Sequence, residues 1–380
     1  MLLANMQWRW FFIVLLILLF ALGTNKSDAL EEAEGDDIGR DKNGDELPEF
    51  ISCVNSTIKT ECHSSNNATL PLYLQLTLWT CEDNCKYNCM HNISDTRPPP
   101  LLQFEGKWPF YRLLGIQEPA SVLFSLGNLL MHYYYLRVMT GKHKNNKSTN
   151  NKEWMDDSTI PKNYYMWPFI LGYCWININT WIQSSFFHTR DLPWTEKLDY
   201  FSAAMSILYS VYFAILRIFH IEQRARQLWI GGVLLVLYLV HVGFMSFVSF
   251  HYVYNMIACG IFAFIQGAMW VLWYIVAFLK KDKRVLAYGH WVIYATGANA
   301  MAILLEVFDF PPLGRVLDAH SLWHFSTIFV TPLWYHFVIQ DSLSECHWSL
   351  LPQTDDENYN YHQHYDNNEV ERQEVIALRQ

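Results

Sequence analysis

Charged residues are scarce in this sequence: only 17% of its 380 residues are Asp, Glu, Lys or Arg, whereas soluble domains average roughly 25%. Hydrophobic residues make up 52% of the chain and aromatic residues 16%. The mean hydropathy is nevertheless only +0.03, so the apolar residues must be concentrated in blocks separated by very polar stretches. This distribution excludes an ordinary soluble protein and predicts an all-α polytopic membrane protein with soluble appendages.

Three functional patterns are also missing. No stripe of Lys and Arg with interleaved aromatic residues occurs, which argues against nucleic acid as a partner. No Gly-x-Ser-x-Gly elbow occurs, which disfavours a serine hydrolase of the α/β type. No His-Glu-x-x-His occurs either, which disfavours a zincin-type protease.

The net charge of −9 comes from two acidic segments. Residues 27–50 contain ten acids and two bases, and residues 341–380 contain nine acids and two bases. The rest of the chain sums to +6. The acidity therefore belongs to two appendages and not to the hydrophobic part between them.

The first hydrophobic run, residues 10–22, is short and follows a single base, Arg9. A helix needs about 20 apolar residues to cross a bilayer. The run therefore predicts a signal peptide at residues 1–23 that is cleaved after Gly23, with a signal anchor as the alternative.

Residues 24–107 are then expected to form a lumenal or extracellular cysteine-rich region. It contains three N-glycosylation sequons, which begin at Asn55, Asn67 and Asn92. It also contains five cysteines: Cys53, Cys62, Cys81, Cys85 and Cys89. Disulfides stabilise small modules in oxidising compartments, although the x3 spacing of the last three would also suit metal binding on a helix. Because five is odd, one thiol is expected to be free or to pair elsewhere.

Seven apolar segments follow, each long enough to span about 30 Å of hydrocarbon. They cover residues 119–138, 167–187, 199–219, 227–248, 252–279, 288–307 and 318–339. With a lumenal N-terminus, the loops expected in the cytosol carry thirteen bases, against three in the lumenal loops between spans. This positive-inside bias supports the same orientation. We expect a membrane domain at residues 108–340 and a disordered, acidic cytosolic tail at residues 341–380.

Five polar residues gather at the lumenal ends of these segments. Ser184 and His188 end the second segment, Asp199 begins the third, and His320 and His324 begin the seventh. Each pair is four residues apart and so shares one helix face, and ionisable residues in a membrane segment by default suggest function. Three imidazoles beside a carboxylate are typical of a catalytic zinc site, which can supply hydroxide for attack on an acyl carbonyl. A hydrogen-bonded helix end is the plain alternative for any single histidine.

A serine-hydrolase mechanism ranks second among the mechanisms. It would use Ser184 as nucleophile, a histidine as base and Asp199 to orient that histidine. Three histidines exceed what such a triad needs. Glu118, at the start of the first segment, is a second-tier candidate for the site, and capping of that helix is its equally good alternative role.

Five longer motifs resemble the post-GPI-attachment-to-proteins factor 3 family of GPI phospholipid-remodelling proteins. They are KWPFYR at 107–112, GIQEPAS at 115–121, WIQSSFFHTRD at 181–191, EKLDYF at 196–201 and DAHSLWH at 318–324. The resemblance runs from the cysteine cluster through the seventh segment and omits the acidic linker and the tail. That family is grouped with alkaline ceramidases and adiponectin-type receptors in the CREST superfamily of seven-span metal-dependent hydrolases.

The resemblance implies that His188, His320 and His324 bind zinc, with Asp199 and Ser184 beside the activated water. It also implies an activity: removal of the unsaturated sn-2 acyl chain from the phosphatidylinositol of GPI-anchored proteins, which leaves a lyso-GPI. The expected location is the Golgi membrane, or alternatively the endoplasmic reticulum, with membrane lipid and GPI-anchored proteins as partners. A ceramidase-like amidase and a non-enzymatic GPI-protein sorting receptor are the alternatives.

Overall fold

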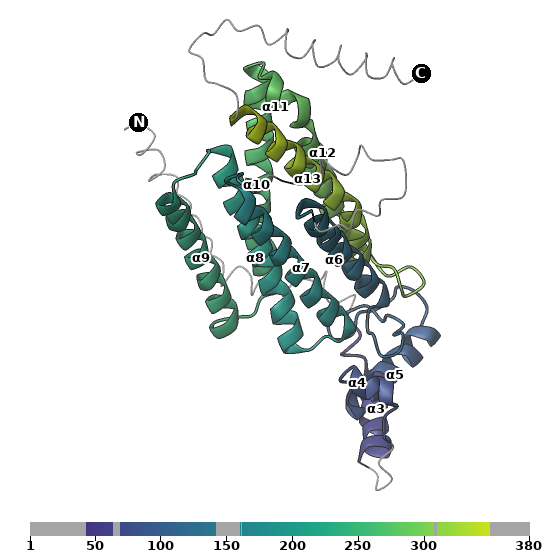
Figure 1. The fold of residues 1–380 in the computed structure, drawn as a ribbon. Helices are drawn as coiled ribbons and strands as arrows, with labels where there is room; N and C mark the ends of the chain where they lie inside the picture. Colours follow the sequence, from purple (N-terminus) through teal and green to yellow (C-terminus); the bar gives the residue numbers. More distant parts are fainter. Residues whose placement is uncertain (1–42, 64–68, 142–159, 161, 308–309, 350–380) are drawn as a thin grey trace, which may run out of the picture.

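The computed structural model describes residues 43–63, 69–141, 160, 162–307 and 310–349 (Figure 1). Within these residues the regular elements are helices, joined by loops with a few isolated bridges. The predicted signal peptide, most of the acidic linker, the sequon at Asn67 and the part of the tail beyond Ser349 lie outside the described residues.

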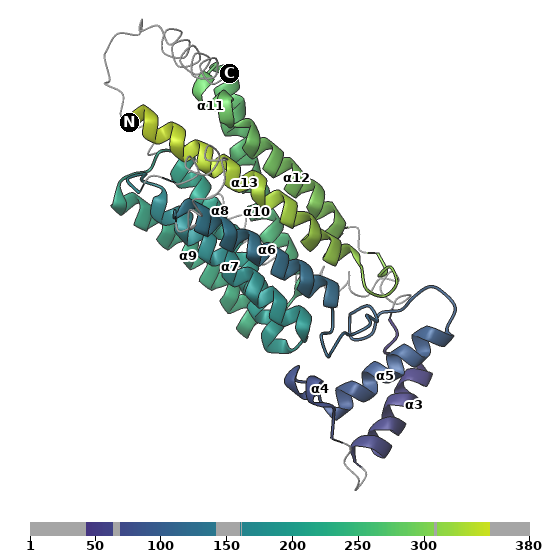
Figure 2. The ribbon, with the colours of Figure 1, turned by 45° about the vertical axis from the view of Figure 1, so that its right-hand side comes forward.

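The cysteine-rich region forms a small helical module beyond one end of the long helices (Figure 2). It contains α3 (Pro48–Thr57), the π-helix η2 (Ile58–Cys62), α4 (Leu72–Leu76) and α5 (Cys81–Thr96). Helix α5 starts at Thr80, whose hydroxyl accepts from the Asp83 amide while the Asp83 carboxylate accepts from the Thr80 amide. This reciprocal capping satisfies two of the amide groups that a helix N-terminus leaves unpaired.

Two disulfides hold the module together. They join Cys53 to Cys89 and Cys62 to Cys81, and they leave Cys85 as a buried free thiol. The apolar cluster around them is small, with Phe50, Cys89, Leu102 and Phe104 at its centre. A core of this size needs covalent links to be stable.

Seven long helices coincide with the seven apolar segments. They are α6 (Pro119–Met139), α7 (Trp167–Thr189), α8 (Pro193–Ile218), α9 (Arg224–Phe247), α10 (Tyr252–Leu279), α12 (His290–Val307) and α13 (Ala319–Ser349). The short α11 (Lys283–Tyr288) lies between α10 and α12. By length and composition, α8, α9 and α10 could each cross a membrane, which makes this a membrane protein. Helices α6 and α7 bury polar side chains inside the bundle. Seven spans stay a prediction.

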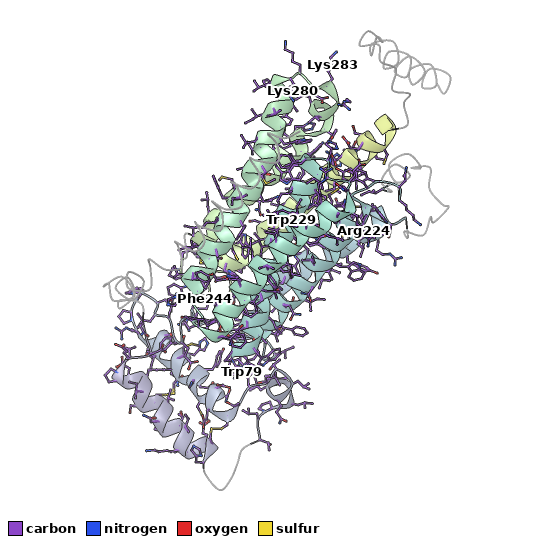
Figure 3. The ribbon with its side chains drawn as sticks, turned by 90° about the vertical axis from the view of Figure 1, so that its left-hand side faces the viewer. Trp79, Arg224, Trp229, Phe244, Lys280 and Lys283 are labelled. Atoms are coloured by element: carbon purple, nitrogen blue, oxygen red, sulfur yellow. A yellow bond between two sulfur atoms is a disulfide. The ribbon has the colours of Figure 1, made fainter. Side chains whose placement is uncertain are left out.

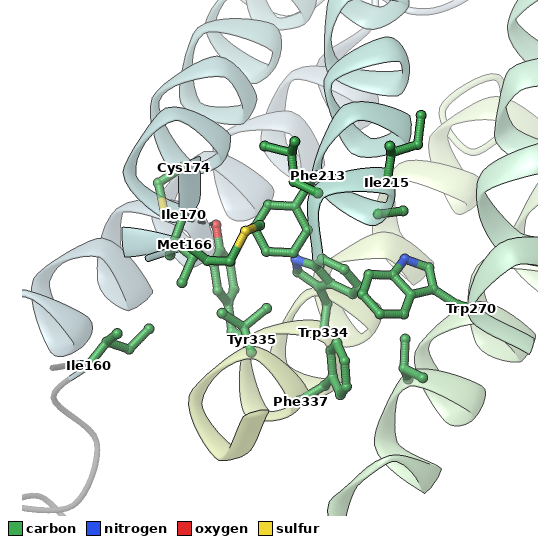
Figure 4. Packing of buried hydrophobic residues seen from close by; sticks show 14 of the residues in the cluster. Ile160, Met166, Ile170, Cys174, Phe213, Ile215, Trp270, Trp334, Tyr335 and Phe337 are labelled. Atoms are coloured by element: carbon green, nitrogen blue, oxygen red, sulfur yellow. Dashed lines mark hydrogen bonds between the residues drawn. The ribbon is translucent and has the colours of Figure 1, made fainter. Parts of the chain in front are cut away.

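The bundle is organised around α6, α7, α8 and α13. Helix α6 packs between α7 and α13, α8 packs on α7 and α10, and α12 packs on α13. Helix α9 contacts α8 and lies at the edge (Figure 1). Large aromatic side chains fill the centre, where the rings of Trp270 and Phe337 are 5.1 Å apart and those of Phe213 and Trp334 are 5.8 Å apart (Figure 4). Such ring pairs add to the stability gained from burial alone.

Two helices are longer than the hydropathy predicted. Helix α8 begins at Pro193 and not at residue 199, because proline suits the first helical turn and the Thr195 hydroxyl accepts from the Leu192 amide. Helix α13 continues to Ser349, so the predicted tail boundary at residue 341 was placed inside a helix. Asp341 is buried there and binds Arg217. The first nine residues of the predicted disordered tail are therefore helical.

The cysteine-rich module and the basic residues after α10 lie at opposite ends of the bundle (Figure 3). Trp79 of the cysteine-rich module marks one end, and Lys280 and Lys283 mark the other (Figure 3). The basic residues that led us to expect a cytosolic loop between α10 and α12 thus lie away from the glycosylation sequons. The orientation of the chain in a membrane stays a prediction.

Candidate metal centre

Three histidines from two helices converge at the end of the bundle that faces the cysteine-rich module. His188 is in the last turn of α7, and His320 and His324 are in the first two turns of α13. The Nε2 atoms of His188 and His320 are 3.2 Å apart, and one ring nitrogen from each of the three histidines lies within 4.8 Å of the others. Two nitrogens bound to one tetrahedral zinc ion at 2.0–2.1 Å would be about 3.3 Å apart. The spacing therefore fits a zinc ion.

The other ring nitrogen of each histidine is held by an oxygen atom. Nδ1 of His188 is 2.7 Å from Glu118 Oε2, and Nδ1 of His320 is 2.6 Å from Glu306 Oε2. Nδ1 of His324 is 2.9 Å from the hydroxyl of Ser125. Histidines that bind metals almost always have such a partner behind them, because it fixes the tautomer and turns the ring toward the metal.

These partners fix the protonation of two of the rings. An ionised carboxylate only accepts hydrogen bonds, so Nδ1 of His188 and of His320 must carry the proton. When both rings are neutral, the two Nε2 atoms present lone pairs to each other across 3.2 Å; when one ring carries a second proton, that proton lies between them. Two acceptors that face each other in a buried site repel, and a cation between them removes the repulsion. The donor set therefore fits a metal ion.

Glu118 belongs to this centre and does not cap α6. It occupies the N-cap position, but its side chain makes no capping hydrogen bond. Instead, Lys107 Nζ donates to Glu118 Oε1 at 2.7 Å and lies 3.1 Å from Asp191 Oδ2. Burial alone would raise the pKa of Glu118, but the positive charge of Lys107 and the hydrogen bond from His188 outweigh it and hold this pKa well below its usual value. The Glu118 amide also donates to the His188 carbonyl at 3.0 Å, which ties the start of α6 to the end of α7.

Ser184 lies behind the histidines. Its hydroxyl is 3.0 Å from the Ser125 hydroxyl, and Ser125 in turn contacts His324. Ser184 is thus linked to the centre through one other side chain. It makes no direct contact with a histidine among the described residues.

Asp199 lies on the second turn of α8, partly buried. Its carboxylate interacts electrostatically with His188 and His320. In the part of the chain that the structure describes, this carboxylate accepts no hydrogen bond. An acceptor without a partner beside three imidazoles can take a proton or orient a water molecule.

Two residues that hold the histidines, Glu306 and Ser125, were not predicted from the sequence. Glu306 is the only acid in the apolar segment 288–307, and this isolation was a signal that could have identified it. Its other oxygen accepts from the Tyr252 hydroxyl at 3.0 Å. Ser125 gives no such signal, because a serine in a membrane helix is common.

The cysteine-rich module contains a second group of possible ligands, Cys62, Cys81 and Cys85. The first two are joined in a disulfide, and a disulfide offers no thiolate to a metal. Cys81 and Cys89 thus pair with cysteines of other segments, whereas Cys85, between them on the same helix, stays a free thiol. Asn55 on α3 and Asn92 on α5 are exposed, and their glycosylation stays a prediction.

Comparison with known proteins identifies the family. A profile of the Per1-like family matches residues 71–342. This chain belongs to the Per1-like family. The matched residues include α6 to α12, nearly all of α13 and every residue of the three-histidine centre, and they confirm the resemblance that the motifs indicated.

Three Per1-like relatives illustrate the similarity. "Protein PER1 homolog" of Schizosaccharomyces pombe is 34% identical over 320 residues, which cover 82% of this chain and 89% of the relative. "GPI-specific phospholipase A2-like PGAP3" of Danio rerio is 36% identical over 311 residues, or 79% and 90% of the two chains. The protein of the same name from Homo sapiens is 33% identical over 309 residues, or 79% and 89%.

Proposed function

We propose that this Per1-like protein is a GPI-remodelling hydrolase that cleaves the sn-2 acyl ester of the phosphatidylinositol in GPI anchors and leaves a lyso-GPI. The observation that carries the proposal is the buried set of three histidines, whose inner nitrogens converge while oxygen atoms hold the outer ones. The relatives named GPI-specific phospholipase A2-like support the choice of substrate and reaction.

His188, His320 and His324 would hold the metal ion, for which zinc is our choice. A zinc ion in such a site lowers the pKa of a bound water and polarises an acyl carbonyl. Asp199 accepts the proton of the attacking water, and its open carboxylate suits this role. Ser184 donates to the oxygen of the carbonyl as negative charge develops on it.

The position of the centre also supports this proposal. The histidines lie at the ends of α7 and α13 that face the cysteine-rich module (Figure 2), which we take to be lumenal. In a lumenal leaflet, an sn-2 ester lies just below the headgroups, at the depth of helix ends. The reactive water and the ester would therefore meet without either moving through the bilayer.

Lipid analysis of cells that lack the protein tests the substrate. Persistence of GPI with an unsaturated sn-2 chain supports the proposal. Unchanged GPI together with raised ceramide would point to a ceramidase-like amidase instead.

Replacement of the ligands tests catalysis. We expect His320→Ala and His324→Ala to abolish remodelling while the protein stays folded and correctly located, because each removes one of three metal ligands. His336→Ala is the matched control, since it lies on the same helix and contacts Trp291 away from the centre. If remodelling continued in both ligand variants, the protein would be a sorting receptor and not a hydrolase.

A further inference from the structure

A cavity of about 100 Å³ lies where the cysteine-rich module meets the helix bundle, and Trp79, which Figure 3 labels, is part of its wall. The module contributes Asp83 and Lys86 of α5 to its wall, and the turn between α7 and α8 contributes Arg190 and Asp191. A cavity needs about 10–15 Å³ of this volume for each water molecule. This one therefore has room for several waters, or for a group of the size of one sugar ring.

The charges around the cavity balance. Lys86 pairs with Glu105 at 2.5 Å. Lys107 pairs with Asp191 at 3.1 Å, and Arg190 pairs with Asp83 at 2.7 Å. A site for a bare phosphate would offer unpaired cations. Equal numbers of paired charges favour a ligand with little net charge and many polar groups.

The wall nevertheless keeps hydrogen-bonding capacity. An ammonium group has three donors, and Lys107 uses two of them, on Glu118 and Asp191. Nε of Arg190 is buried and has no partner among the described residues. Each carboxylate in the wall can accept more than one hydrogen bond. Donors and acceptors thus alternate, which suits hydroxyl groups because each of them both donates and accepts.

Apart from Gln117 and Tyr87, the rest of the wall is apolar. Buried aromatic side chains form it, together with the partly buried Met90. The aromatic residues are Phe50, Trp79, Phe104, Trp108 and Phe110. Binding pockets typically combine such apolar walls with a few polar groups that fix the orientation of the ligand. A sugar ring has the matching surface, with C–H groups on its faces and hydroxyls at its edge.

The cavity is connected to the metal centre by two side chains. Lys107 lines the cavity and donates to one oxygen of Glu118, whose other oxygen binds Nδ1 of His188. A ligand in the cavity would therefore lie on the module side of the histidines. In the substrate that we propose, the glycan lies on the same side of the acyl ester.

We propose that this cavity binds one sugar ring of the glycan headgroup of the GPI substrate. The inference rests on the proposed function and adds to it the basis of selectivity: phosphatidylinositol without a glycan would leave the cavity empty. The sugar ring would hold the headgroup while the acyl ester reaches the three histidines.

The test uses the purified full-length protein in detergent, freed of its own N-glycans so that only added sugar can occupy the cavity. The probe is the water-soluble GPI headgroup without its acyl chains. We expect it to inhibit hydrolysis of GPI competitively. Met90→Trp fills the cavity and should raise both KM and the inhibition constant of the probe about tenfold, with kcat little changed.

Two further variants guard against misfolding as the explanation. Glu105→Gln, at the exposed rim, should raise KM by a smaller factor in the same direction. Glu49→Gln is the matched control, because Glu49 forms a similarly exposed pair with Arg97 on the same module, away from the cavity. The KM and the inhibition constant of the probe in this control should equal those of the unmodified protein.

Three outcomes would overturn the inference: no inhibition by the probe, unchanged KM in both cavity variants, or equal inhibition by inositol phosphate that carries no sugar. If the protein hydrolysed no GPI at all, that result would contradict the proposed function without bearing on the cavity. Saturation-transfer NMR with the same probe would then show whether the cavity binds the headgroup, since it detects binding without turnover.

Discussion

The helix bundle buries two polar clusters, one near each end, and they differ in how far their groups are satisfied. Near the end away from the cysteine-rich module, the guanidinium of Arg217 donates to Asp341 at 2.6 and 2.7 Å and to Glu345 at 2.9 Å, and its remaining amino group contacts His220 at 3.2 Å. The hydroxyl of Tyr288 also donates to Asp341. Nearly every donor meets an acceptor.

The three-histidine centre is the opposite case. Its outer nitrogens are held by oxygen atoms, whereas its inner nitrogens converge on a space that could hold a metal ion. Both clusters are buried, and both are costly to assemble. The Arg217 cluster is satisfied by its own side chains and holds helices together, whereas the three-histidine centre leaves ring nitrogens directed at one another.

The largest expected effect concerns the cluster around Arg217, whose polar groups are satisfied within the chain. Arg217→Met removes one partner and leaves the buried carboxylate of Asp341 uncompensated, which typically costs about 3–5 kcal/mol. We expect a large loss of folded protein, measured as the monodisperse fraction in detergent and as the temperature of unfolding.

A double variant separates charge from packing at this cluster. Arg217→Met with Asp341→Leu replaces both charges by apolar groups and should recover part of the lost stability. If the single variant were as stable as the unmodified protein, water would have to reach Asp341. The two clusters would then not differ in how far their polar groups depend on partners within the chain.

The next largest effect concerns Ser184. If its hydroxyl donates to the developing oxyanion, Ser184→Ala should lower kcat by about 10²–10³-fold without loss of metal. Ser125→Ala should instead loosen His324 and lower the metal content. Loss of metal with normal kcat per bound metal in Ser184→Ala would show that Ser184 acts only through Ser125.

The carboxylates behind the histidines should have an intermediate effect. Glu118→Gln and Glu306→Gln keep the size of each side chain but remove the charge, and loss of such partners typically weakens metal binding by about 10–100-fold. Titration of the metal against a chelator measures this. Glu49→Gln serves as the surface control. Unchanged metal affinity in both variants would mean that these carboxylates only fill space.

The contrast between the clusters also explains what the sequence could predict. Ser184 and His188 share one helix and His320 and His324 share another, so the spacing of four residues revealed both pairs. Glu306 and Ser125 come from other helices, α12 and α6, and tertiary contacts of this kind leave no local pattern. Arg217 was counted among the thirteen bases of the expected cytosolic loops and Asp341 was placed in the acidic tail for the same reason, because the ion pair between them joins α8 to α13.

Helix positions were predicted better than helix ends. Hydropathy located all seven long helices, because the apolar centre of each helix gives a segment of high hydropathy. It missed the first turns of α8, where Glu196 and Lys197 lower the hydropathy, and the last turns of α13 around Glu345. Both extensions lie where polar side chains can reach water or a partner, which hydropathy alone does not recognise.

The smallest expected effect is a pH dependence of stability at His91 of the cysteine-rich module. Its Nε2 contacts the Phe110 carbonyl at 3.1 Å and its Nδ1 contacts the Arg315 guanidinium at 3.1 Å, so both nitrogens are satisfied in the neutral ring. Burial lowers the pKa of His91, and the positive charges of Arg315 and Arg112 lower it further, while Asp95 opposes them.

The unfolded chain then binds a proton near pH 6.5 that the folded chain does not yet bind, so stability falls as the pH falls below that value. One such group changes the unfolding free energy by at most about 1.4 kcal/mol per pH unit. We expect the unfolding temperature to drop more between pH 7.5 and 5.5 in the unmodified protein than in His91→Gln. Equal drops would mean that His91 titrates alike in the folded and unfolded states.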